Sequence, residues 1–164
     1  MTTDPTPRLV LMCGLPGAGK TTVARRLALE IPAVRLSPDE WLDDLGIDIF
    51  ADEIRDRLET RFWHLARELL AGGVSVILES GFWTRHDRDE KRLGARALGA
   101  RVELHYLDVP FDELCRRVSA RPGPTADAPS PFTRELMTSY VGHFAVPDEQ
   151  ELALFDPPTR SKAE

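Results

Sequence analysis

The sequence predicts an α/β fold in which helices cover both faces of a parallel β-sheet, giving three layers. Two observations lead to this fold class. Short apolar segments of strand length alternate with longer segments whose apolar residues recur at helical spacing. A glycine-rich turn also joins the first apolar segment directly to the first helical one. Strands that alternate with helices build parallel sheets, and ligands bind at the carboxyl ends of such strands.

The first half of the chain predicts two strands and two helices. Residues 9–13 form an apolar strand, and a helix from about 20 to 30 follows until Pro32 stops it. Residues 33–36 form a short second strand. The next helix ends at the glycine pair 72–73. Its apolar stripe consists of Ile54, Leu58, Phe62, Leu65 and Leu69.

The second half continues the alternation. Residues 74–78 predict a third strand, 84–98 a polar helix, 102–107 a fourth strand, and 111–118 a further helix. The apolar run 152–155 predicts a weak fifth strand. The expected sheet is therefore parallel and five-stranded.

The chain has the length of one domain. Its 164 residues contain 42% hydrophobic amino acids, enough for a single core. We expect one domain over 1–164, with its core at about 8–156 and flexible tails at 1–7 and 157–164. Residues 122–131 are rich in proline and small side chains, which predicts a mobile loop inside the domain. Residues 132–144 predict a helix after it.

Composition restricts the location and the partners. The formal net charge is −6, which argues against a large nucleic-acid footprint. Cys13 and Cys115 lie far apart and lack metal-ligand spacing, so we expect reduced core cysteines. No signal-peptide pattern and no apolar run of membrane length is present, which predicts a cytoplasmic protein without a membrane partner. The oligomeric state stays open.

The glycine-rich turn is a complete phosphate-binding loop. Residues 14–21 read Gly-Leu-Pro-Gly-Ala-Gly-Lys-Thr, the G-x-x-x-x-G-K-[ST] pattern, after a strand and at the start of a helix. Gly14, Gly17 and Gly19 let successive N–H groups turn inward around a phosphate. Lys20 then reaches the β and γ oxygens, and the Thr21 hydroxyl serves Mg²⁺.

The sequence therefore predicts a nucleoside triphosphate, ATP, as cofactor together with Mg²⁺. An Asn-Lys-x-Asp type guanine motif is absent. The alternative is a glycine-rich turn without a ligand. The residues expected to bind the nucleotide are Gly14, Leu15, Pro16, Gly17, Ala18, Gly19, Lys20, Thr21 and Thr22.

Four segments together resemble the small P-loop kinases of the AAA_33-like group, with polynucleotide-kinase-like, chloramphenicol-phosphotransferase-like and gluconate-kinase-like members. They are residues 14–21, 37–39, 77–80 and 116–121. The resemblance extends from about residue 8 to 155, and the phosphate loop is its one highly specific motif. It implies a P-loop NTPase fold of the nucleotide-kinase type and transfer of the ATP γ-phosphoryl group to a hydroxyl.

Asp39 is the candidate general base. It follows the second predicted strand directly, so its carboxylate is expected to project into the cleft opposite the phosphate loop. The resemblance implies a base at this position, and proton transfer to it would assist attack by an acceptor hydroxyl. The alternative is that Asp39 only caps or charges the first turn of the next helix.

Glu79 is the candidate second residue of the magnesium site. It ends an apolar strand, where a carboxylate can hold or orient Mg²⁺ beside Thr21. The sequence departs here from the family pattern, since many relatives have aspartate. The alternative is a carboxylate paired with a nearby arginine.

Arg117 and Arg121 resemble the lid arginines of this group, which implies a lid at about 117–133. Four residues apart in a predicted helix, they can point the same way beside the loop. The resemblance implies that they neutralise charge on the transferred phosphoryl group. Arg116 falls nearer the opposite face. The alternative is a solvated basic face.

The acceptor site is expected to lie beside aromatic residues. Its candidate residues are Trp41, Phe82, Trp83 and Arg85. The aromatic ones have an alternative role in packing. Asp39, Glu40, Asp43 and Asp44 make the neighbouring segment acidic unless Arg35, Arg85 or Arg88 offsets it, which favours a neutral or cationic acceptor.

Three functions follow in order of preference. The first is a small-molecule kinase that takes a nucleoside triphosphate and a small hydroxylated acceptor such as a sugar, nucleoside or antibiotic. The second is a polynucleotide 5′-hydroxyl kinase, which the acidic balance makes unlikely. The third is a non-catalytic ATP-binding regulator, which would not need Asp39.

Overall fold

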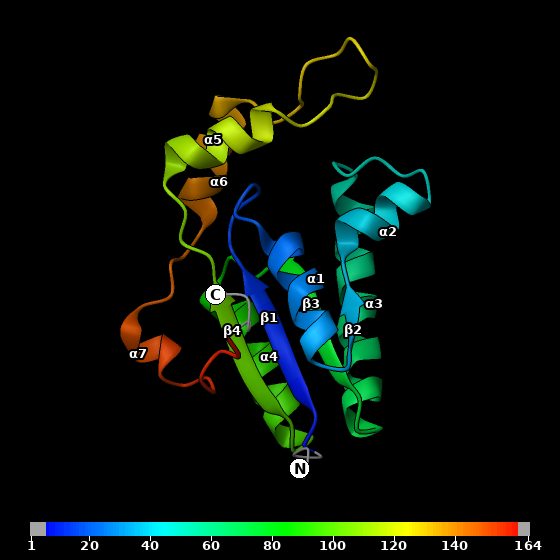
Figure 1. Cartoon of the computed structure of the whole chain (residues 1–164), viewed down its shortest axis with the longest axis vertical. Coiled ribbons are helices and arrows are strands. Elements are labelled where there is room, and N and C mark those ends of the chain that lie inside the picture. The colour runs from blue at the N-terminus through cyan, green and yellow to red at the C-terminus, as the bar shows by residue number, and fades with distance from the viewer. Residues whose placement is uncertain (1–5, 161–164) are drawn as a thin grey trace.

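A four-stranded parallel sheet forms the centre of the protein (Figure 1). The computed structural model describes residues 6–160. The strands β1 (Arg8–Cys13), β2 (Ala33–Leu36), β3 (Ser75–Gly81) and β4 (Arg101–Tyr106) lie in the order β2-β3-β1-β4. All paired neighbours run parallel. The predicted α/β class is therefore confirmed.

The central strand β1 buries side chains on both faces of the sheet. Leu9 and Leu11 belong to a core cluster that includes side chains of the helices α3 (Asp52–Ala71) and α4 (Arg85–Ala97). Val10 and Met12 pack instead with the helix α1 (Lys20–Glu30). Because side chains alternate across a strand, a continuous apolar run buries one set on each face. This arrangement produces the three expected layers.

The remaining helices lie around the carboxyl ends of the strands and along one edge. The helices α5 (Phe111–Ser119) and α6 (Arg134–His143) share a third apolar cluster with the phosphate loop. The helix α2 (Pro38–Asp44) packs near α3, and α7 (Glu149–Leu152) lies beside β4 (Figure 1). The loop between α5 and α6 extends from the top of the molecule and carries no helix or strand.

The predicted fifth strand is wrong. Residues 149–152 form the short helix α7, and within the described residues 6–160 a single bridge between Glu103 and Asp156 continues the sheet. Asp148 explains the difference, because its carboxylate accepts a hydrogen bond from the Glu151 backbone N–H at 2.7 Å and so caps a helix. Local capping outweighs the apolar character of residues 152–155.

Two predicted boundaries also shift. The strand β3 runs three residues beyond residue 78, so Glu79 lies within a strand. The helix α5 ends at Ser119, which places Arg121 in the turn beyond it.

The predicted tails differ from each other. Residues 1–5 and 161–164 lie outside the described residues. Thr159, within the predicted C-terminal tail, is anchored: its hydroxyl lies 3.0 Å from Glu103 Oε2 and accepts from Arg8 at 2.6 Å.

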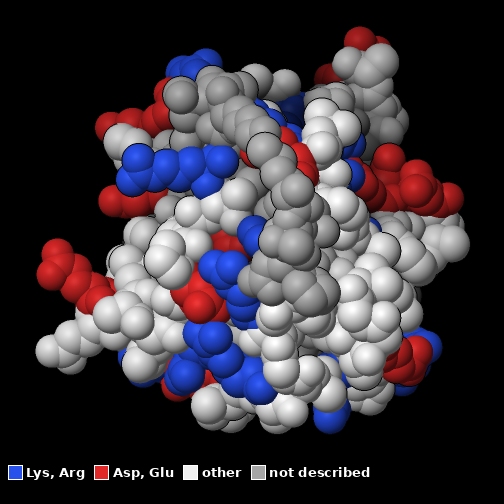
Figure 2. Space-filling view, turned by 60° about the horizontal axis from the view of Figure 1, so that its bottom comes forward, with Lys and Arg blue, Asp and Glu red and all other residues white. Residues whose placement is uncertain are grey.

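The charge distribution on the surface is mixed. On the face at the bottom of Figure 1, basic and acidic side chains lie side by side (Figure 2). No helix among the described residues is long and apolar enough to cross a membrane.

Candidate active site

The phosphate loop lies between β1 and α1 and is packed against α5. Gly17 has a φ of 86°, and a Cβ there would lie 3.0 Å from Val118 Cγ1 and 3.1 Å from the Leu114 carbonyl oxygen. A side chain at this position would therefore clash with the backbone of α5, and its own backbone dihedral angles would be strained. Glycine at position 17 allows α5 to approach the loop closely.

Lys20 folds back onto the loop that carries it. Its ammonium group donates to the carbonyl oxygens of Gly14 at 3.0 Å and Leu15 at 2.9 Å. Burial lowers the pKa of Lys20 to about 8, Asp39 opposes this shift, and Arg121 adds to it. Negative charge brought to the loop would stabilise the protonated form.

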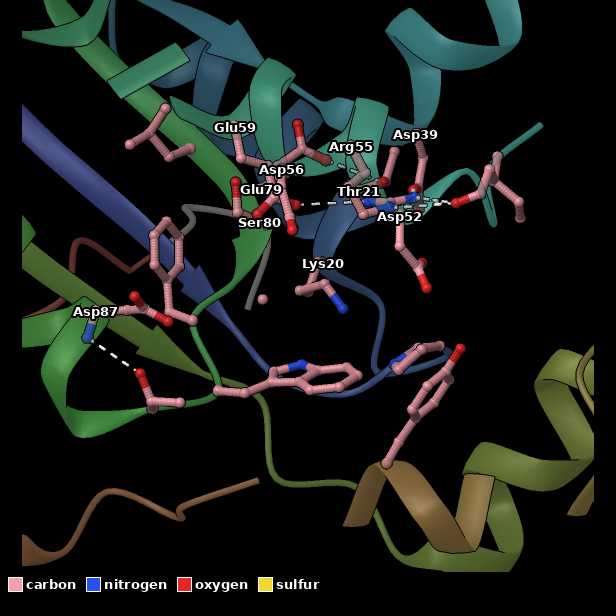
Figure 3. Close-up of a pocket in the computed structure, with 18 of the residues that line it drawn as sticks. Lys20, Thr21, Asp39, Asp52, Arg55, Asp56, Glu59, Glu79, Ser80 and Asp87 are labelled. Carbon is pink, nitrogen blue, oxygen red and sulfur yellow. Dashed lines mark hydrogen bonds and ion pairs between the residues drawn. The ribbon is translucent and has the colours of Figure 1, made fainter. Parts of the chain in front are cut away.

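A cavity of about 940 Å³ opens from the phosphate loop (Figure 3). Lys20, Thr21 and Thr22 line it on one side, and Asp39 and Glu79 also face it. Most of the remaining wall comes from α3, from the end of β3 with the turn that follows, and from α4. The volume is in the range of small-molecule sites.

Asp39 faces the cavity from the first turn of α2. The cap of this helix is Ser37, whose hydroxyl accepts from the Glu40 backbone N–H at 3.4 Å. Asp39 is therefore not needed as the cap, and its side chain is 61% exposed. It forms an ion pair with Arg55 of α3, whose guanidinium also donates to the Ile49 carbonyl oxygen.

Glu79 joins the phosphate loop to β2. Thr21 donates its hydroxyl to Glu79 Oε1 at 2.9 Å, and Arg35 Nε donates to Oε2 at 2.9 Å. Burial raises the pKa of Glu79, while Thr21 and Arg35 act in the opposite direction. Glu79 therefore lies beside the Thr21 hydroxyl, as the predicted magnesium site requires, and is also paired with an arginine, as the alternative states. Hydroxyl and carboxylate oxygens fit the ligand chemistry of Mg²⁺.

The three arginines near the end of α5 occupy different surroundings. Arg117 Nη1 donates to the Gly17 carbonyl oxygen of the phosphate loop at 3.1 Å. Arg121 lines the cavity, and its guanidinium lies 5.1 Å from the ring centroid of Phe132. Arg116 pairs with Glu113 on the exposed side of the helix. Arg121 thus lines the cavity, whereas Arg117 contacts the phosphate loop without lining it, and the predicted role of both at the phosphoryl group stays a prediction.

The four predicted acceptor residues are not brought together. Trp41 packs edge-to-face on Phe62 at 5.0 Å, and Arg85 pairs with Asp89, so neither lines the cavity. Phe82 and Trp83 do line it.

Trp83 contacts the phosphate loop as well as α6. Its indole N–H donates to the Gly14 carbonyl oxygen at 3.2 Å, the same oxygen that Lys20 contacts. Its ring centroid lies 5.0 Å from that of Tyr140 on α6. Trp83 therefore links the loop to α6.

A buried ion pair supports the turn that carries Phe82 and Trp83. Arg88 donates through Nε to Glu151 Oε1 at 2.6 Å and through Nη2 to Oε2 at 3.0 Å. Its Nη1 donates to the Phe82 carbonyl oxygen at 2.9 Å. Phe82 has a φ of 49°, an uncommon value for a residue with a side chain, and Arg88 holds its backbone in this conformation.

Sequence reasoning missed the contribution of α3 to the cavity. Asp52, Arg55, Asp56 and Glu59 of this helix all face the hollow. Their spacing of three and four residues places them on one helical face, and this is the signal that could have found them. The acidic residues Glu40, Asp43 and Asp44 of α2 do not line the cavity.

The fold and the site define the class of the protein. A parallel sheet with a phosphate loop after its central strand is the P-loop kinase fold. A family model described as an AAA domain matches residues 9–147. The chain belongs to this family, and the resemblance predicted from the sequence is confirmed.

A curated relative of the chain is a kinase. The chain is similar to shikimate kinase from Rhodopseudomonas palustris, with 27% identity over 118 residues, which cover 70% of this chain and 56% of that enzyme. The chain thus spans little more than half the length of this curated relative.

Solved structures share the fold. A sugar kinase from Janibacter sp. HTCC2649 is 25% identical with a TM-score of 0.61, and the match covers 90% of this chain and 82% of that one. A chain in the Pnkp1/Rnl/Hen1 RNA repair complex has a TM-score of 0.70 at 20% identity over 86% of this chain and 45% of that one. The second likeness shows the fold alone.

Proposed function

We propose that the protein transfers the γ-phosphoryl group of Mg·ATP to a hydroxyl of a small molecule. One observation carries the proposal: Lys20 of the phosphate loop and the Asp39 carboxylate face the same cavity of about 940 Å³. A cavity of this size accommodates a phosphate tail and a small acceptor together. The similarity to shikimate kinase and to a sugar kinase supports a small hydroxylated acceptor.

The reaction is a direct displacement at phosphorus. The acceptor oxygen forms a bond to the γ-phosphorus atom while the bond to the oxygen bridging the β and γ groups breaks, and ADP leaves. The hydroxyl proton passes to a carboxylate oxygen of Asp39. Arg55 holds this carboxylate in place through its ion pair. Positioned proton transfer contributes about 10²–10⁴-fold in enzymes generally.

Positive side chains stabilise the charge that spreads over the transferred group. Lys20 is close to the γ-phosphate position by virtue of the loop motif. Arg121 faces the cavity and Arg117 holds the loop carbonyl of Gly17. Arginines in this role are worth about 10³–10⁵ in rate in P-loop enzymes. We assign Arg121 to contact with phosphate and Arg117 to positioning of the loop.

Thr21 and Glu79 would hold the magnesium ion of the nucleotide. When bound, Mg²⁺ neutralises phosphate charge and orients the β and γ groups. The Thr21 hydroxyl, which donates to Glu79, would turn its oxygen to the metal. Arg35 keeps the Glu79 carboxylate in position from the opposite side.

The substitution Asp39→Asn tests the proposal. Hydroxylated metabolites and antibiotics are first screened for stimulated ADP release, with a 5′-hydroxyl oligonucleotide included. For the best acceptor, we expect Asp39→Asn to lower kcat by about 10²–10⁴-fold because the proton acceptor is lost. The affinity for Mg·ATP should change less than about twofold, far below the tenfold that 1.4 kcal/mol represents.

Asp43→Asn is the matched control, since Asp43 lies on the same helix but does not line the cavity. Its kcat should equal that of the unmodified protein. Equal turnover in Asp39→Asn would remove this residue from the mechanism. ATP binding without stimulation by any acceptor would favour a non-catalytic nucleotide-binding protein.

A further inference from the structure

The wall of the cavity away from the phosphate loop is acidic. Asp52, Asp56 and Glu59 face it from α3, and Asp87 faces it from α4 (Figure 3). Glu90 of α4 also lines the cavity. Figure 3 labels Asp56 and Glu59 next to Glu79, on the side of Lys20 away from α5 and α6. This wall adjoins the Asp39 carboxylate, where the acceptor of the proposed reaction would lie.

The basic residues in this part of the cavity already have partners. Arg55 pairs with Asp39 and lies 3.6 Å from Glu59. Lys91 pairs with Glu90 at 2.6 Å. Within residues 6–160, the structure records no ion pair for the remaining carboxylates, Asp52, Asp56 and Asp87. The negative charge of the wall is therefore only partly balanced.

Glu59 has a raised pKa, chiefly because its carboxyl group is buried. Burial raises the pKa of Glu59 to about 7, Arg55 opposes the shift, and the neighbouring charges of Asp56 and Asp39 add to it. A cation placed beside Glu59 and Asp56 would stabilise the ionised carboxylates, whereas an anion would increase the repulsion.

The same cavity already accommodates one ammonium group by this chemistry. The Lys91 ammonium lies 5.5 Å from the ring centroid of Trp63, and Glu90 pairs with it. Both Trp63 and Lys91 line the cavity. An aromatic face together with a carboxylate is a common way to bind a cation.

Building on the proposed function, we propose that the acceptor is a hydroxylated amine, such as an amino sugar, whose ammonium group is bound by Asp56 and Glu59. These two residues determine specificity, while Asp39 accepts the hydroxyl proton. Phosphorylation occurs on oxygen, and the amine remains protonated throughout. Carboxylate-bearing acceptors are disfavoured, because Arg55 is already engaged by Asp39 and Glu59.

The test compares acceptors that share a hydroxylated six-carbon skeleton but differ in charge. Glucosamine, glucose and gluconate carry a positive, neutral and negative group, and kanamycin adds a larger polyamine. Binding to the full chain loaded with a non-hydrolysable ATP analogue and Mg²⁺ is measured by calorimetry, and ADP release is measured with ATP. We expect an amine to bind at least about tenfold more tightly than glucose, because one favourable charge contact provides a gain of about this size. Gluconate should bind most weakly.

Variants then assign the effect to the acidic wall. Glu59→Gln combined with Asp56→Asn should raise KM for the amine about tenfold or more, leave KM for ATP unchanged, and reduce the preference over glucose. The matched control is Glu53→Gln, because Glu53 lies on the same helix, is exposed, and pairs only with Arg57 among the residues described. This variant should retain the preference for amines.

The outcomes separate this inference from the proposed function. If gluconate or another acid is the preferred acceptor, or if no amine binds more tightly than its neutral counterpart, the inference is overturned and the kinase function stands. An amine preference that persists in the double variant also overturns it. Failure of the chain to bind Mg·ATP would instead overturn the proposed function.

Discussion

Removing Arg88 should destabilise the protein strongly. Its side chain is 1% exposed, and that of its partner Glu151 is 3% exposed. Two hydrogen bonds join the pair, and a third joins Arg88 to the Phe82 carbonyl oxygen. Arg88→Met retains much of the side-chain volume but leaves a carboxylate and a carbonyl buried without this donor.

The expected loss follows from this geometry. Breaking a buried ion pair by removing one partner costs about 3–5 kcal/mol. At roughly 2–4 °C per kcal/mol for a chain of this length, Tm should fall by roughly 6–20 °C. Thermal and urea unfolding, both followed by circular dichroism, measure the loss. The double variant Arg88→Met with Glu151→Leu removes both charges and should recover most of the stability.

Two results would refute this reasoning. A loss of less than about 1 kcal/mol in Arg88→Met would mean that the attraction between Arg88 and Glu151 does not outweigh the cost of burying the two charges. A double variant no more stable than Arg88→Met would mean that the buried Glu151 carboxylate, left without Arg88 and with only Arg85 at 3.6 Å, is not the cause. Arg96→Met serves as a control, since Arg96 lies on the same helix and pairs with Asp156 at the surface. It should cost about 1 kcal/mol or less.

Three further predictions concern the nucleotide side. The pKa of Lys20 is about 8 in the free protein, and a bound phosphate favours the charged form, so ATP binding should take up a proton at about pH 8.5. Above that pH, the affinity for ATP should fall about tenfold per pH unit. Calorimetry in two buffers measures the proton uptake and the affinity, and equal affinity at pH 7 and 9.5 would contradict this prediction. Gly17→Ala should weaken ATP binding at least tenfold, because its Cβ would lie 3.0 Å from Val118, and unchanged affinity would show that the loop tolerates the methyl group. Trp83→Phe removes the hydrogen bond to Gly14 and should cost about 0.5–1.5 kcal/mol in urea unfolding, a loss that would be absent if the indole N–H were equally well solvated by water.

Local patterns predicted most of the fold. The helix over 20–30 and the strand over 33–36 match the structure residue for residue, because helical spacing and a proline stop act within a few residues. The fifth strand was wrong for an equally local reason. Asp148 followed three residues later by Glu151 is a helix-start pattern that the apolar run 152–155 concealed.

The site was predictable where a motif or a strand end marks a residue. Lys20, Asp39 and Glu79 face one cavity, although their roles stay predictions. The acidic face of α3 was not predicted, because its orientation toward the cavity depends on packing across the sheet. The pair of Arg88 and Glu151 joins residues 63 positions apart, a separation that no spacing rule detects.

The alternation of side chains along β1 has a consequence for mutational studies and for divergence of the sequence. Changes at Leu9 or Leu11 affect the layer that contains α3 and α4, whereas changes at Val10 or Met12 affect the layer that contains α1. The two halves of the interior can thus be repacked independently by substitutions in a single strand. A one-residue deletion there would exchange the two sets and mismatch both layers at once.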